Sequence, residues 1–111
     1  MASDARRDEW ARSQRKRRER MGAFLDSLRR RPCEVKLRCG PKRYRRELAH
    51  VRATDVVGRG RGLERRYFDV LRNPDAYVVA CLPCHGYLDR HHRYPGSRKA
   101  LGLQGTVLCP N

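Results

Sequence analysis

The sequence predicts a small α+β domain that a metal ion holds together, with a long basic helix in front of it. The chain has 111 residues, of which only 39% are hydrophobic, so a large apolar core cannot form. Domains this small usually need a disulfide or a metal ion for stability. Four of the five cysteines fall into two pairs, as metal ligands do. Stretches with helix and strand periodicity alternate along the chain, which predicts the α+β class.

The charge of the chain predicts a polyanionic partner. Lys and Arg total 27 against 12 Asp and Glu, which gives a net charge of +15. Arginine far outnumbers lysine, and its planar guanidinium group favours bidentate contact with phosphate. We therefore expect the partner to be a nucleic acid, DNA in the first place, with RNA as a second possibility.

The sequence also predicts where the chain works. No apolar run approaches the roughly 20 residues that a membrane-spanning helix needs. The start, MASDARRDEW, lacks the apolar segment of a secretory signal. We expect a cytoplasmic protein that is neither secreted nor bound to a membrane. Thiols stay reduced in that compartment, so the cysteines are expected to bind metal rather than form disulfides.

Residues 1–31 are predicted to form a basic N-terminal helix or arm, helical from residue 4. Its first part, ARRDEWARSQRKRRER, is polar and mostly basic. Its second part has an apolar stripe at helical spacing, formed by Met21, Phe24, Leu25 and Leu28. The basic part is either a solvated arm or a helix that lies along DNA phosphates. In the second case it binds through Arg15, Arg17 and Arg18.

Residues 32–95 are predicted to form the metal-stabilised domain, beginning at the helix-ending Pro32. Periodicity and turn residues predict a strand at 46–53, a glycine-rich turn at 56–62, a helix at 63–73, a strand at 76–81, and a helix from Pro83 to about His92. Residues 96–111 are rich in turn formers and predict an irregular C-terminal tail.

Two cysteine pairs predict a tetrahedral structural zinc site, Cys33 with Cys39 and Cys81 with Cys84. Cys109 is left over, either as a free thiol or as a replacement for one of the four. The segment CLPCH also matches haem c attachment, but no export signal and no convincing methionine ligand accompany it. A thioredoxin-like redox pair would need a βαβ context, and here the motif comes late in the chain.

The helix after Cys81 carries candidate ligands for a second ion. His85 and Asp89 are one turn apart, about 6 Å along the axis, so they can share an ion. His91 points to another face, and His92 lies about 10 Å further along. These last two histidines fit a polar helix end, where positive charge suits the helix dipole.

With these segments the sequence resembles the HNH endonucleases, the ββα-metal family. The matching segments are ELAHVRA with its strand histidine, His50, then RNPDAYVVACLPCH, and the upstream Cys33 and Cys39 of zinc-containing members. The resemblance spans roughly residues 33–92. It implies a small ββα-metal domain with a purely structural zinc site.

The resemblance also implies roles for individual residues. His50 would be the general base that activates water, His85 a ligand of the catalytic divalent ion, and Asp89 a further ligand. The asparagine of the family aligns with Ala76 in this sequence. Asn73, three residues earlier, would take its place as the catalytic-loop asparagine. Ala49 stands where many members carry a metal ligand. The alternatives to it are Glu47, Asp55 and His50 itself.

The predicted function is metal-dependent hydrolysis of DNA phosphodiester bonds. A set of imidazole and carboxylate ligands accepts Mg²⁺, Mn²⁺, Ni²⁺ or Zn²⁺. Arginines near the site would hold the phosphate backbone: Arg43, Arg45, Arg46, Arg59, Arg61, Arg65 and Arg66. One alternative is a non-catalytic zinc module that binds nucleic acid. Another is a homodimer or a subunit of a larger nuclease or phage packaging assembly.

Overall fold

A computed structural model describes residues 2–56, 62–90 and 94–109, and confirms the α+β class. Its main elements are α1 (Ala2–Arg29), β1 (Arg46–His50), α2 (Leu63–Arg72), β2 (Tyr77–Cys81) and α3 (Leu82–Arg90). Short 3-10 helices occupy Pro74–Ala76 and Lys99–Leu101. In the part of the chain that the structure describes, no helix has the length and apolar character needed to cross a membrane.

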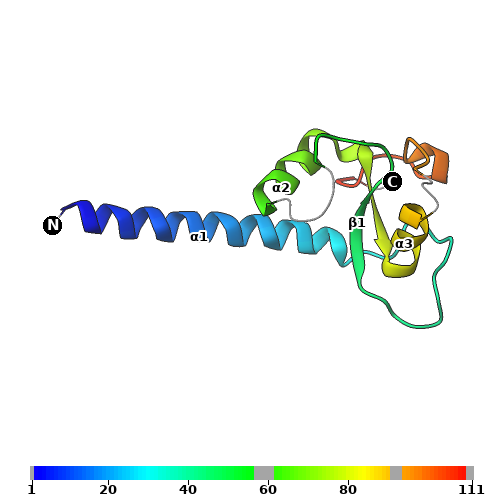
Figure 1. Ribbon diagram of the computed structural model, residues 1–111, viewed down its shortest axis with the longest axis horizontal. Helices are drawn as coiled ribbons and strands as arrows, with labels where there is room; N and C mark the ends of the chain where they lie inside the picture. The colour runs from blue at the N-terminus through cyan, green and yellow to red at the C-terminus, as the bar shows by residue number, and fades with distance from the viewer. Residues whose placement is uncertain (1, 57–61, 91–93, 110–111) are drawn as a thin grey trace.

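The N-terminal half of helix α1 projects away from the rest of the molecule (Figure 1). Its 28 residues give it a length of about 42 Å. Buried side chains begin only at Met21 and continue with Leu25 and Leu28, so the predicted stripe packs while the basic first part is mostly exposed. The helix ends at Arg29, two residues before the predicted end, and a last turn follows in which Arg31 N–H donates to Leu28 O.

The sheet consists of β1 and β2 in antiparallel pairing, with Leu48 opposite Val79 and His50 opposite Tyr77. The first strand was predicted to reach residue 53 but ends at His50. Beyond it the Val51 N–H still donates to Ala76 O, while Val51 O accepts from the Gly96 N–H. The Val51 carbonyl is thus bound by Gly96 and not by β2, while the Ala76 N–H donates to Asn73 O within the 3-10 turn.

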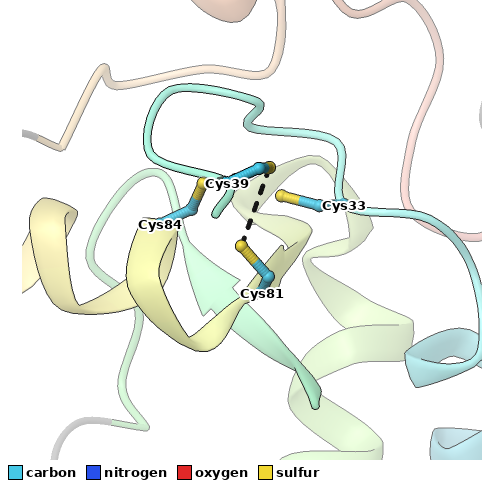
Figure 2. Close-up of side chains that lie close together, drawn as sticks. All are labelled: Cys33, Cys39, Cys81 and Cys84. Atoms are coloured by element: carbon cyan, nitrogen blue, oxygen red, sulfur yellow. Dashed lines mark hydrogen bonds between the residues drawn. The ribbon is translucent and has the colours of Figure 1, made fainter. Parts of the chain in front are cut away.

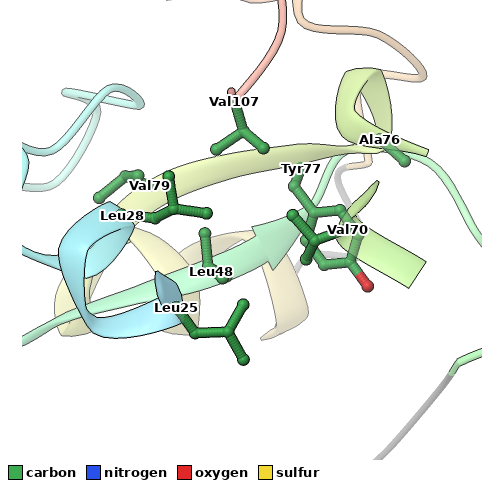
Figure 3. Close-up of a cluster of buried hydrophobic side chains, with 8 residues drawn as sticks. All are labelled: Leu25, Leu28, Leu48, Val70, Ala76, Tyr77, Val79 and Val107. Carbon is green, nitrogen blue, oxygen red and sulfur yellow. The ribbon is translucent and has the colours of Figure 1, made fainter. Parts of the chain in front are cut away.

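The core lies on both faces of this small sheet. One cluster joins α1, α2 and the sheet (Figure 3), and contains Leu25, Leu28, Leu48, Val70, Ala76, Tyr77, Val79 and Val107. The other lies on the α3 side, and contains Val35, Ala49, Val51, Val78, Ala80, Cys81, Cys84 and Leu88. Residues 77–80 of β2 alternate between the two clusters, and Cys81 joins Ala80 in the second one. All five residues of β2 are buried, as expected for a strand covered on both faces.

Small shifts separate the other predicted elements from the observed ones. The helix α2 ends at Arg72, one residue early, and Ala76 belongs to the 3-10 turn rather than to β2. The helix α3 starts at Leu82, directly after β2, where Pro83 falls in its first turn. The described part of the tail, residues 96–109, is mainly irregular, contains the 3-10 helix Lys99–Leu101 and places Val107 in the core.

Candidate functional site

The four predicted zinc ligands form one cluster, the cysteine cluster (Figure 2). Cys33 and Cys39 come from the loop between α1 and β1, Cys81 ends β2, and Cys84 lies in the first turn of α3. Their sulfur atoms all lie within 4.8 Å of one another, and Cys39 Sγ is 3.7 Å from the sulfurs of both Cys81 and Cys84. Thiolates about 2.3 Å from one tetrahedral ion would lie about 3.8 Å apart. The cluster could therefore hold a metal ion.

The ionisation of these thiols also fits a cation. Burial raises the pKa of the Cys33 thiol, but backbone N–H groups of Lys36 and Cys81 and the neighbouring thiols outweigh it and lower the pKa to about 7. Burial and the sulfur groups of Cys84, Cys33 and Cys81 raise the pKa of Cys39 to about 12. One thiolate thus suppresses ionisation of another, and a divalent cation would remove that conflict. The Arg38 N–H points at Cys84 Sγ from 3.2 Å, and Cys109 is exposed and outside the cluster.

Buried polar contacts fix the loop that carries Cys33. The next residue, Glu34, exchanges hydrogen bonds with Val79, from Glu34 N–H to Val79 O at 2.7 Å and from Val79 N–H to Glu34 Oε1 at 2.8 Å. Arg98 of the tail donates to both Glu34 carboxylate oxygens and to Tyr77 O. The guanidinium group therefore connects the cysteine loop, β2 and the tail.

A second site is a cavity of about 570 Å³ between β1 and α3, the histidine cleft. It brings together the residues predicted as general base and ion ligands, His50, His85 and Asp89. The remaining lining residues are Arg29, Glu47, Leu48, Arg66, Leu82, Gly86 and Tyr94. His50 stands at the end of β1 and His85 in the first turns of α3, so the short sheet and the helix that follows it set their separation.

His85 has a carboxylate at each ring nitrogen. Nδ1 is 2.9 Å from Glu47 Oε1, and Nε2 is 3.5 Å from Asp89 Oδ2. If the Nδ1 proton is donated to Glu47, Nε2 carries the lone pair and faces a second acceptor, Asp89. Such a pair of acceptors needs a proton or a metal ion between them. Carboxylate–histidine–metal arrangements have this form, with the carboxylate fixing the ring and the other nitrogen binding the ion.

The ring of His50 contacts a partly buried network of polar side chains. Its Nε2 is 3.0 Å from Thr54 Oγ1 and 3.8 Å from Asp69 Oδ2, and the ring packs against Tyr77 at a tilt of 41°, with 4.4 Å between centroids. Thr54 Oγ1 donates to Asp69 Oδ2 at 2.7 Å, and the Tyr77 hydroxyl donates to the same oxygen. The carboxylate of Asp69, on α2, is thus the centre of the network.

Asn73 belongs to this network and not to the lining of the cleft. Its Nδ2 donates to Asp69 Oδ1 at 3.0 Å, and its backbone N–H donates to Asp69 O at 2.8 Å. Asn73 therefore fixes the turn after α2. Asp69 and Thr54 were not identified from the sequence as residues of the site. The one available signal for Asp69 was its place next to Val70, on the buried face of α2.

The predicted phosphate-binding arginines occupy different surroundings. Arg66 lines the histidine cleft. Arg45 and Arg46, with Arg29, Arg30, Asp26 and Glu47, line a neighbouring cavity of about 580 Å³. Arg46 also donates to Arg29 O and Arg30 O, where it caps α1. Arg43 and Arg65 are exposed.

On α1, Arg15 and Arg18 are exposed, whereas Arg17 forms an ion pair with Glu64 of α2 at 3.0 Å. Four of the residues singled out in the sequence lie outside the described residues: Arg59, Arg61, His91 and His92. No family model, no curated protein and no solved structure matches this chain.

Proposed function

We propose that this chain is a metal-dependent endonuclease of the HNH type that hydrolyses DNA phosphodiester bonds, with a zinc ion in the cysteine cluster as a structural element. One observation carries the proposal: His50, His85 and Asp89 line the same cleft, with Arg29 and Arg66 beside them. The cavity therefore offers candidates for a base, for two metal ligands and for cationic contacts with phosphate, which are the parts that phosphodiester hydrolysis requires.

His50 is the general base. Burial lowers the pKa of its imidazole below 6.5, more than Asp69 raises it, and the charge of Arg66 lowers it further. The ring is therefore neutral at physiological pH and accepts a proton from water. The water oxygen forms a bond to phosphorus, the bond from phosphorus to the 3′ oxygen breaks, and the leaving oxygen takes a proton from solvent.

His85 and Asp89 would hold the divalent ion, and Glu47 would fix the ring of His85. The separation of 3.5 Å between His85 Nε2 and Asp89 Oδ2 suits two ligands of one ion. When bound, a divalent ion such as Mg²⁺, Mn²⁺, Ni²⁺ or Zn²⁺ neutralises charge on the phosphate and on the leaving oxygen. In this arrangement Glu47 compensates for Ala49 by orienting a ligand.

The arginines supply contact with the DNA backbone. Arg29 and Arg66 flank the cleft, and Arg45 and Arg46 lie at the adjoining cavity, which shares Arg29 and Glu47 with it. A DNA backbone that enters the cleft would pass these side chains. The exposed basic residues of α1 extend the positive surface beyond the domain, so the helix acts as a clamp without sequence preference.

A plasmid-nicking assay tests the proposal, with Mg²⁺, Mn²⁺ or EDTA added to the purified full chain. We expect cleavage with a divalent ion and none with EDTA. His50→Ala is expected to abolish cleavage and to leave DNA binding and zinc content near those of the wild type. A wild-type chain that never nicks DNA, or a His50→Ala variant that still does, contradicts the proposal.

A second candidate function is a non-catalytic zinc module that binds nucleic acid. Two observations favour it. Ala49 is buried in the core cluster on the α3 side, so its position does not offer a ligand to the cleft. Asn73 is occupied with Asp69. DNA binding without metal-dependent cleavage in the same assay would select this alternative.

A further inference from the structure

Asp69 is a buried acid held by several donors. The residue is 6% exposed, and its carboxylate accepts hydrogen bonds from Thr54, Asn73 and Tyr77. Burial raises the pKa of Asp69, but these donors lower it below its ordinary value overall. The carboxylate is therefore ionised at neutral pH and acts only as an acceptor.

That fixes the direction of the neighbouring hydrogen bonds. Thr54 has one hydroxyl proton and two acceptors near it, Val56 O at 3.3 Å and Asp69 Oδ2 at 2.7 Å. The shorter contact takes the proton, because two oxygen atoms 2.7 Å apart need one between them and the carboxylate cannot donate. The Thr54 oxygen is then an acceptor toward His50 Nε2 at 3.0 Å. An acceptor at this position requires a proton on Nε2. A neutral imidazole protonated at Nε2 carries its lone pair on Nδ1.

From this geometry we infer that Thr54 and Asp69 are positioning residues that hold His50 in the Nε2–H tautomer and make Nδ1 the basic nitrogen. His50 lines the histidine cleft, so a fixed tautomer would keep one lone pair ready for a proton from water. The catalytic consequence rests on the proposed nuclease function, whereas the tautomer itself does not. Neither Thr54 nor Asp69 lines the cleft, so both act through His50.

Long-range ¹H–¹⁵N correlation spectra of the zinc-loaded full chain test the tautomer directly, because they distinguish a protonated from an unprotonated ring nitrogen. The spectrum of His50→Ala identifies the His50 signals among those of the four histidines. We expect a neutral ring with Nε2 protonated. A ring protonated at Nδ1, or an even mixture of both tautomers, overturns the inference whether or not the chain cleaves DNA.

Thr54→Val and Thr54→Ser test the role of the hydroxyl. Valine has nearly the shape of threonine but cannot bridge, whereas serine keeps the bridge. We expect Thr54→Val to give a mixture of tautomers and to lower kcat at least tenfold, part of the roughly 100- to 10,000-fold that general acid–base catalysis contributes. KM for DNA should stay unchanged, and Thr54→Ser should retain both the tautomer and kcat.

The outcomes separate this inference from the proposed function. An unchanged tautomer and kcat in Thr54→Val, or equal losses in the valine and serine variants, overturn the positioning role. If Thr54→Val does not fold, the wild-type spectrum still decides. If the wild-type chain cleaves no DNA with any divalent ion, the proposed function fails, while the spectrum still reports the tautomer of His50.

Discussion

Nδ1 of His85 lies 2.9 Å from Oε1 of Glu47, so a strand residue fixes the ring of a helix residue. Burial raises the pKa of Glu47, but His85 and Arg45 outweigh that effect and keep the pKa below its ordinary value. The carboxylate is therefore a charged acceptor for the Nδ1 proton. Glu47 lies 38 residues before His85 in the sequence, and this contact brings β1 and α3 together at one site.

Glu47→Gln should weaken binding of a divalent ion at the histidine cleft. The amide keeps the shape of the side chain but loses the charge that orients His85, and such losses typically cost about 10- to 100-fold in metal affinity. Calorimetric titration with Mn²⁺ measures this on the zinc-loaded chain. Asp26→Asn is the matched control, because Asp26 lines only the neighbouring cavity. Equal affinity in Glu47→Gln and the wild type would show that Glu47 does not serve the ion.

Cys39→Ser should remove the ion from the cysteine cluster and destabilise the fold. Cys39 is exposed, so its replacement costs little packing, and the loss reports the missing ligand. Loss of a structural metal is among the few changes that reach about 4 kcal/mol or more. Cys109→Ser is the control, since Cys109 is also exposed but lies outside the cluster. Elemental analysis and urea unfolding measure both quantities, and similar values for the two variants would exclude the site.

Arg98→Met should destabilise the chain far more than Arg52→Met. The side chains of Arg98 and Glu34 are 2% and 12% exposed, and removing one partner of a buried pair costs about 3–5 kcal/mol. Arg52 and Asp75 form an exposed pair worth under about 1 kcal/mol. Urea unfolding of both variants measures the loss in free energy of unfolding. Equal losses would mean that the buried pair stabilises the chain no more than the exposed pair does.

The same pair gives a pH dependence. Burial raises the pKa of Glu34, yet Arg98 and the Val79 N–H lower it overall below the ordinary value of 4.5. The stabilisation from this carboxylate is present above that value and is lost as the pH falls through the lower pKa of the folded state. The difference in free energy of unfolding between the wild type and Arg98→Met should therefore shrink on acidification. A difference in free energy of unfolding that does not change with pH would contradict this role of the Glu34–Arg98 pair.

The predictable and unpredictable parts of this chain differ in how far apart the interacting residues lie in sequence. Local periodicity located α1 to within two residues at each end and β2 to within one residue, and cysteine spacing identified the four residues of the cluster. Glu34 and Arg98 are 64 residues apart, and nothing local marks them as partners. No motif in the sequence marks Asp69, because only tertiary packing brings it next to His50 and Tyr77.

Arg15→Ala combined with Arg18→Ala should weaken DNA binding without changing stability. Both side chains are exposed on the part of α1 ahead of the buried stripe, so they carry charge but little packing. Each lost phosphate contact lowers the slope of log affinity against log salt by about 1, so the double variant should lose about 2. Arg52→Ala is the control, because Arg52 is paired with Asp75. An unchanged slope, measured by fluorescence anisotropy, would exclude the clamp.

Asp69→Asn should move the acid limb of the cleavage profile to lower pH. Burial lowers the pKa of His50 from 6.5, Asp69 raises it, and Arg66 and His85 lower it, so the wild-type limb should already fall below 6.5. Removing the negative charge takes away the one raising influence and lowers the pKa further. The matched control is Glu64→Gln, which removes an exposed charge from the same helix. Profiles of kcat are measured at saturating Mn²⁺ at each pH, and a shift toward higher pH in Asp69→Asn would show that Asp69 does not act in this way on His50, the proposed general base.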